Sequence, residues 1–169
     1  MAELIRLARY EEAIRVSAEL VDEAPGTESF AQHRLARAAW LLDRGRALTF
    51  DDKDHEALLT LEQALVLEPE SEVVLMWVGK TRAKIAMVLF HEGFDLHSSE
   101  EYAAATEKYT EALEMNPAHE GASRGRELAS RQSQYRSEEH TLNSSHGVIS
   151  YAVFCLKKKT THTHTPSPA

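Results

Sequence analysis

Three stretches of this chain repeat one pattern of small and large apolar residues, and each stretch ends at a proline. They begin at residues 10, 54 and 102, and the proline follows fifteen residues later in each. An alanine stands three positions after each start, and further apolar residues recur on the same side at helical spacing. Because proline cannot continue an α-helix, the pattern predicts three amphipathic helices of similar length.

The segments before the second and third stretches also have a helical pattern. Residues 28–50 and 71–96 contain no proline, and we expect each to form a helix about 30 to 40 Å long. We expect residues 2–23 to form one continuous helix, because only nine residues precede Tyr10. Residues 118–134 are helical in pattern but polar, and we expect them to form a solvated closing helix. The chain should therefore contain five to six helices.

Polar residues mark the starts of two of these helices. Asp51 or Asp52 is expected to cap the second repeated stretch. Ser98 and Glu101 have the spacing of a capping box ahead of Tyr102. Both signals predict a helix start immediately before a repeated stretch.

The repeated pattern, together with the glycines that precede it, resembles the tetratricopeptide repeat (TPR). The resemblance implies an all-α fold in which antiparallel helical hairpins stack into an α-solenoid. It also implies that Gly45 and Gly93 let paired helices approach closely. The residues that carry the resemblance are Tyr10, Ala13, Pro25, Leu41, Gly45, Leu48, Ala57, Ala64, Pro69, Gly93, Tyr102, Ala105, Tyr109, Ala112 and Pro117.

The match to the TPR is incomplete in two respects. The three prolines are 44 and 48 residues apart, whereas the period of the family is about 34 residues. We expect the surplus to lengthen the first helix of each hairpin rather than to form inserted loops. The first repeat also lacks most of its first helix, and we interpret the chain as a fragment of a longer protein.

Residues 136–169 differ from the rest of the chain. They carry a net charge of +2, whereas residues 1–135 carry −10. The stretch from Arg136 to Lys159 resembles the conceptual translation of a short-read sequencing adapter, and the Thr-His run after it resembles a translated dinucleotide repeat. We therefore predict a TPR-like domain over residues 1–135 and a non-native, disordered tail over residues 136–169.

The composition and motifs argue against several functional classes. A net charge of −8 does not favour nucleic-acid binding, which needs clustered Lys and Arg. No apolar run is long enough to span a membrane and no signal peptide is recognisable, so we expect a cytoplasmic protein. The single cysteine and the scattered histidines make no metal-ligand pattern, and no catalytic motif occurs. We expect a protein that is not an enzyme and that uses no cofactor or metal.

The TPR resemblance implies that a partner binds in a groove lined by the first helices of the hairpins. In the helix expected over residues 71–96, one face carries side chains spaced by four, three, four and three residues. They run from Lys80 through Lys84, Met87 and His91 to Phe94. This face would suit a peptide with apolar and acidic groups. The alternative is that Met87, Phe90 and Phe94 pack against the preceding hairpin as core. The predicted groove residues are Lys80, Lys84, Met87, Phe90, His91, Phe94 and His97.

We predict a protein–protein interaction scaffold, and two other functions remain open. They are a regulatory segment of a larger enzyme whose catalytic domain this fragment lacks, and a structural spacer within a longer solenoid. TPR domains that clamp a chaperone carboxylate use Asn side chains from the groove, and the chain contains only Asn116 and Asn143, so no such clamp is expected. We interpret the basic residues of the helix over residues 28–50 as a solvated face; they are Arg34, Arg37, Arg44 and Arg46.

Overall fold

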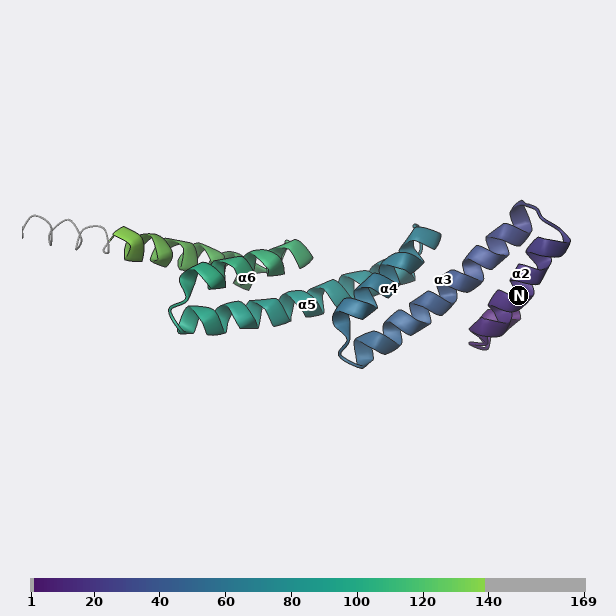
Figure 1. The fold of residues 1–169 in the computed structure, drawn as a ribbon, viewed down its shortest axis with the longest axis horizontal. Coiled ribbons are helices and arrows are strands. Elements are labelled where there is room, and N and C mark those ends of the chain that lie inside the picture. The colour runs from purple at the N-terminus through teal and green to yellow at the C-terminus, as the bar shows by residue number, and fades with distance from the viewer. Residues whose placement is uncertain (1, 139–169) are drawn as a thin grey trace, which may run out of the picture.

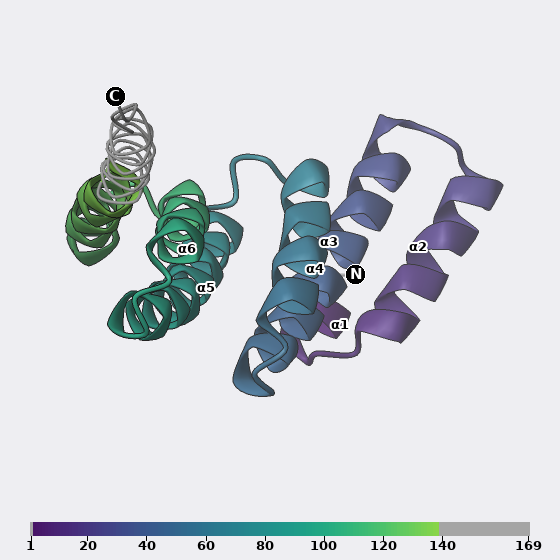
Figure 2. The same cartoon turned by 60° about the vertical axis from the view of Figure 1, so that its left-hand side comes forward.

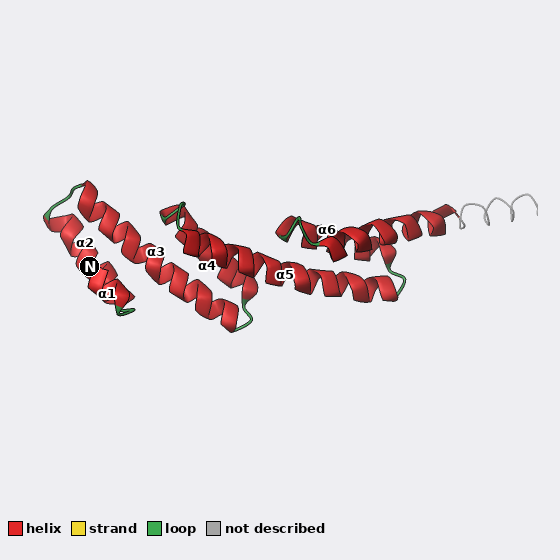
Figure 3. Ribbon diagram, turned by 180° about the vertical axis from the view of Figure 1, so that it is seen from behind, coloured by secondary structure: helices red, strands yellow, loops and turns green. Residues whose placement is uncertain are grey.

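The computed structural model describes residues 2–138, and its regular structure is helical throughout this range (Figure 3). The helices are α1 (Ala2–Arg6), α2 (Tyr10–Glu23), α3 (Thr27–Phe50), α4 (Asp54–Leu67), α5 (Glu72–Ser98) and α6 (Tyr102–Met115), and a further helix, the C-terminal helix, covers residues 120–138. The predicted all-α fold is confirmed. Seven helices occur in the described range, whereas five to six were expected.

The helices follow one another along an elongated molecule (Figures 1 and 2). Helix α3 pairs with α4, and α5 pairs with α6, as antiparallel hairpins. Helix α2 packs on α3, and α4 packs on α5, so each hairpin is joined to its neighbour through consecutive helices. The C-terminal helix lies against α6 at the end opposite to α1 and α2 (Figure 1).

Three corners with one backbone geometry separate the paired helices. Ala8, Asp52 and Glu100 have φ angles of 56°, 59° and 64°, in the left-handed region that residues other than glycine seldom adopt. At each corner the next residue donates its N–H to a carbonyl five positions back, over 2.9, 3.0 and 2.9 Å, which is the Schellman arrangement at a helix C-terminus. The corners are 44 and 48 residues apart, as the prolines are, so the sequence repeat corresponds to a repeat in the backbone.

The first corner shows that one prediction was wrong. Residues 2–23 were expected to form one helix, but the backbone turns at Ala8 and separates α1 from α2. Helix α1 has only five residues. The corner that joins it to α2 has the same geometry as the corner that joins α3 to α4. The short N-terminal segment is therefore a partner of α2 and not an extension of it.

The predicted capping residues were also wrong. The residues that precede α4 and α6 are Lys53 and Glu101, and neither makes a side-chain capping bond. Ser98 lies inside α5, where its hydroxyl donates to the Phe94 carbonyl over 2.9 Å. The Schellman bonds satisfy carbonyls at the end of the preceding helix, and no side chain caps the N-terminus of α4 or α6.

The long helices differ in length by close to one helical turn. We expected helices over residues 28–50 and 71–96, and the structure has the 24-residue α3 and the 27-residue α5. The interval between successive corners grows from 44 to 48 residues. Four residues rotate an α-helix by one turn plus about 40°, so the longer helix still turns the same side toward its partner.

Glycines lie at the closest approaches between helices. A Cβ atom on Gly45 would be 2.6 Å from Leu61 Cγ, and a Cβ atom on Gly93 would be 2.9 Å from the Tyr109 ring. The neighbouring alanines on α2, α4 and α6 are buried, with 0% exposure at Ala13, Ala57, Ala64, Ala105 and Ala112. Small residues thus let each long helix lie close to the helix that follows it.

Gly79 differs from these glycines and provides a stability test. Apart from its chain neighbours and the backbone of its own helix, no atom lies within 4 Å of the position that its Cβ would occupy, so alanine at this site gains helix propensity without a clash. We expect Gly79→Ala to raise the free energy of unfolding by about 1 kcal/mol, measured by urea denaturation and far-UV circular dichroism. Gly93→Ala is the matched control, and it should lower stability because its Cβ meets Tyr109. Equal effects of the two substitutions would contradict this packing.

The C-terminal helix is less solvated than the sequence suggested. Ala122 and Ala129 are fully buried against α6, and a Cβ atom on Gly125 would be 2.6 Å from Tyr109 Cζ. A closing helix is present, but the prediction that residues 118–134 form a solvated helix was wrong for the side that packs on α6. The helix also continues to residue 138, past the predicted start of the tail at residue 136. The rest of that tail lies outside the described residues.

Candidate functional site

The structure separates the seven predicted groove residues of α5 into two groups. Lys80, Met87, His91 and Phe94 are exposed, with 48% of Met87 and 56% of Phe94 accessible to solvent. Lys84, Phe90 and His97 are half-buried and contact other helices. The seven residues therefore do not form one surface.

Lys84 binds the corner between α3 and α4. Its ammonium lies 2.7 Å from Asp52 Oδ1 and 2.9 Å from Asp54 Oδ1, and it donates to the Thr49 carbonyl over 3.0 Å. Hydrogen bonding to Asp52 and then to Asp54 raises the pKa of Lys84, and the same contact lowers the pKa of Asp52. Lys84 thus fastens α5 to the preceding hairpin, and its charge is already compensated within the chain.

The third corner is tied in a similar way. Arg136 of the C-terminal helix donates to the Glu100 carbonyl over 3.0 Å, and its guanidinium lies 3.4 Å from the Glu100 carboxylate. Ala8 stands at the equivalent place in the first corner and has no charge for such a pair. Two of the three corners are therefore held by a cation from the next long helix.

The pair at the second corner predicts a pH dependence of stability. Asp52→Asn retains a residue that tolerates a positive φ but removes the ion pair with Lys84. The pKa of Asp52 is lowered in the folded state, so its contribution is present above the pKa of an unfolded Asp, about 4, and is lost as the pH falls through the folded value. We expect Asp52→Asn to lower the melting temperature at pH 7, and the difference from the parent to vanish under strongly acidic conditions. Asp51→Asn at the adjacent position is the control, and a pH-independent difference for Asp52→Asn would refute the assignment.

Phe90 packs against the core between α5, α6 and the C-terminal helix, and His97 contacts α6 and the C-terminal helix at the edge of that core. The Phe90 ring centroid is 5.9 Å from that of Tyr109 and 4.9 Å from that of His119. His97 Nε2 is 2.5 Å from Gln132 Oε1. Tyr109 is 1% exposed, and burial raises its pKa. Phe90 is thus core, although it packs on its own hairpin and on the segment that follows, and not on the preceding hairpin.

The exposed surface formed by the predicted groove residues extends toward the start of α5. Val73 and Met76 are 49% and 46% exposed, and they precede Lys80 at steps that keep them on its side of the helix. We call this surface the α5 face: Val73, Met76, Lys80, Met87, His91 and Phe94. Val73 and Met76 were not among the predicted groove residues, although extending the helical spacing by two more steps would have included them.

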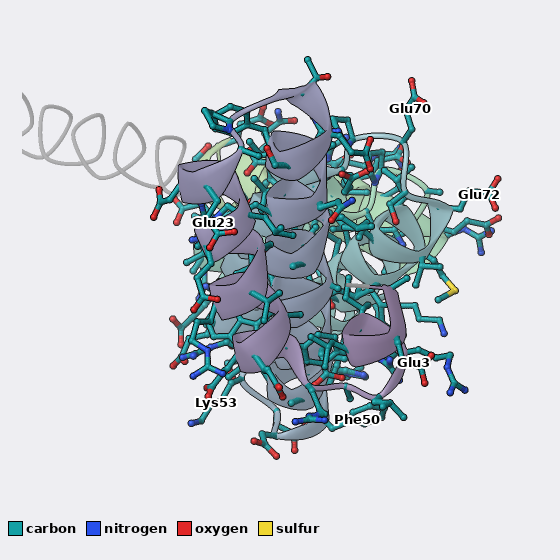
Figure 4. All side chains as sticks on the ribbon, turned by 90° about the vertical axis from the view of Figure 1, so that its right-hand side faces the viewer. Glu3, Glu23, Phe50, Lys53, Glu70 and Glu72 are labelled. Atoms are coloured by element: carbon teal, nitrogen blue, oxygen red, sulfur yellow. The ribbon has the colours of Figure 1, made fainter. Side chains whose placement is uncertain are left out.

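An aromatic cluster lies where α3 meets α5. The Trp77 ring has the Arg46 guanidinium 5.2 Å from its centroid and the Lys80 ammonium 5.0 Å from it. The Phe50 ring contacts Trp77 edge-on, with centroids 5.8 Å apart. Phe50 ends α3 at the rim of the molecule (Figure 4) and is 73% exposed. We call Arg46, Phe50, Trp77 and Lys80 the α3–α5 junction.

The two hollows nearest to the long helices α3 and α5 lie beside the first and second corners and not on the α5 face. One open hollow of about 520 Å³ lies between Tyr10 of α2 and Trp40 and Arg44 of α3. Another, of about 370 Å³, lies beside Lys84 and Leu89. No residue of the α5 face lines either hollow. The α5 face is therefore an open surface and suits an extended partner better than a small molecule.

Two further observations concern residues 2–138. No three His, Cys, Asp or Glu side chains in this range converge in a way that could hold a metal ion. None of the helices in the same range combines the length and the apolar character that a membrane span requires.

Comparison with protein families, with curated proteins and with solved structures gave no significant match to this chain.

Proposed function

We propose that this chain is a TPR-like helical scaffold that binds a peptide or helix of a partner protein along the α5 face. The observation that carries the proposal is the exposure of four large apolar side chains on one side of a 27-residue helix: Val73, Met76, Met87 and Phe94. Large apolar side chains exposed on one side of a helix are typical of sites where another molecule binds. A partner that covers the α5 face removes apolar surface of both molecules from water, and this favours binding.

The repeated backbone supports the TPR-like part of the proposal. The corners at residues 8, 52 and 100 share one geometry, and fully buried alanines stand at residues 13, 57 and 105. Glycine in each of the two long helices lies against the helix that follows. Equivalent residues thus make equivalent contacts in successive hairpins, as expected of a repeat array.

A selection from a random peptide library tests the proposed function. The full chain is immobilised and challenged with a displayed library of 16-residue random peptides, and the affinity of enriched peptides is measured by fluorescence anisotropy. We expect peptides with large apolar side chains at helical spacing. Met87→Glu combined with Phe94→Glu should weaken their binding at least tenfold, because two charges would be buried on binding.

The control variant places the same charges on another exposed apolar surface. Leu59 and Val66 of α4 are 62% and 80% exposed, so Leu59→Glu with Val66→Glu changes charge and hydrophobicity equally. This variant should bind the enriched peptides as the parent does. If the library yields no enriched peptide, or if both variants bind like the parent, the proposed function is wrong, and a structural spacer becomes the better interpretation.

A further inference from the structure

The α3–α5 junction contains two cations without a carboxylate partner. Nine of the sixteen Lys and Arg residues in the described range form ion pairs. Of the other seven, only Arg46 and Lys80 lie over the same ring, that of Trp77. Asp43 is one turn before Arg46 on α3 but forms no ion pair with it. The junction is thus a local concentration of uncompensated positive charge.

The rest of the chain makes this concentration unusual. The protein has a net charge of −8, and exposed carboxylates stand at helix ends and in the loop between α4 and α5, among them Glu3, Glu23, Glu70 and Glu72 (Figure 4). Asp43 flanks one side of the junction, and the Asp52 carboxylate is engaged by Lys84. Arg46 and Lys80 thus place two positive charges without an ion-pair partner next to the exposed α5 face of an acidic protein.

Contact with the Trp77 ring holds the charged groups of Arg46 and Lys80 close to each other. Each distance to the ring centroid is close to 5 Å, so the two charged groups are at most about 10 Å apart, which is the sum of the two distances. The Trp77 ring is held in turn by Phe50 and by the crossing of the helices, where the Thr49 and Thr81 hydroxyls are 3.2 Å apart. A contact with an aromatic face leaves N–H donors of Arg and Lys available to an acceptor.

We infer that the partner segment is acidic and amphipathic: its carboxylate side chains bind Arg46 and Lys80 at the α3–α5 junction, while its apolar side covers the α5 face. The inference rests on the proposed function and names the chemistry of the partner. Phe50 adds an exposed apolar surface beside the two cations, so a carboxylate that binds there has an apolar neighbour. The carboxylates supply the opposite charge that this part of the chain lacks.

The same peptide library tests the charge preference. We expect enriched peptides to contain Asp or Glu beside their apolar residues, and their affinity to fall as the salt concentration rises. Arg46→Glu combined with Lys80→Glu should weaken binding about tenfold and should shift a new selection toward peptides with Lys or Arg. Arg15→Glu combined with Arg126→Glu is the control, because both cations are exposed and unpaired and the change in net charge is the same.

A second variant guards against a loss of folding. Arg46→Gln combined with Lys80→Gln removes the charges without adding repulsion, and thermal denaturation followed by circular dichroism establishes that each variant is folded. Enriched peptides that are neutral or basic, or that bind the charge-reversed protein within twofold of the parent, would overturn the inference. If such peptides still depend on Met87 and Phe94, the proposed function stands and only the acidic partner is excluded.

Discussion

Replacement of Tyr109 by alanine is expected to lower the free energy of unfolding by about 3 to 5 kcal/mol. Tyr109 is 1% exposed and fills the space that Gly93 of α5 and Gly125 of the C-terminal helix leave open. Its removal creates a cavity in which three helices lose a common contact. Urea denaturation followed by far-UV circular dichroism measures the change, and Tyr109→Phe should cost far less because the ring is retained.

A second tyrosine in the same region provides the control for this result. Tyr135 of the C-terminal helix is 70% exposed, and Tyr135→Ala should change stability by no more than about 0.5 kcal/mol. Similar losses for Tyr109→Ala and Tyr135→Ala would show that the packing of α5, α6 and the C-terminal helix differs from that described.

The other large effect is expected at the crossing of α3 and α4. Gly45→Val should lower the free energy of unfolding by about 1 to 3 kcal/mol, because a Cβ atom at this position lies 2.6 Å from Leu61 Cγ. Leu61 is fully buried, and Leu61→Ala alone should cost about 2 to 5 kcal/mol. Both changes are measurable by urea denaturation of the single variants.

The combination of the two substitutions distinguishes close packing from a general loss of helix stability. In the double variant, the methyl groups of the introduced valine would occupy part of the space that the Leu61 side chain vacates. The loss should therefore be smaller than the sum of the single losses by at least about 0.5 kcal/mol. Strict additivity in this double-mutant cycle would mean that the two residues do not compete for the same volume.

The sequence predicted the features that depend on local pattern. Prolines after each repeated stretch indicated where α2, α4 and α6 end, and apolar spacing predicted their buried sides. The lengths of α3 and α5 followed from the absence of proline. These properties depend on residues a few positions apart, so the sequence is sufficient to infer them.

The first corner was not predicted, because alanine is unusual at a positive φ. Glycine is the common residue at positive φ, and the chain has Ala8, Asp52 and Glu100 at these positions. No residue type therefore signalled a break after α1, and the first two helices were predicted as one. The repeat interval was the available signal, since residues 44 and 48 positions apart in the chain take the same conformation.

The candidate site depended on contacts between distant residues. Helical spacing alone left Lys84 available to a partner, whereas the structure places Asp52, 32 residues earlier, against its ammonium. Arg46 and Trp77 are 31 residues apart, and their contact exists only because α3 crosses α5. Helical spacing shows which side chains share a face, but it does not show which of them another helix covers.

The ties at the corners have a consequence for how the molecule responds to force. A pull on the two ends would be resisted at the second corner by the contact of Lys84 with Asp52 and at the third by the contact of Arg136 with Glu100. Among the described residues, no ion pair of this kind holds the corner at Ala8. Extension should therefore begin at the first corner with the detachment of α1, which has five residues and none of them buried.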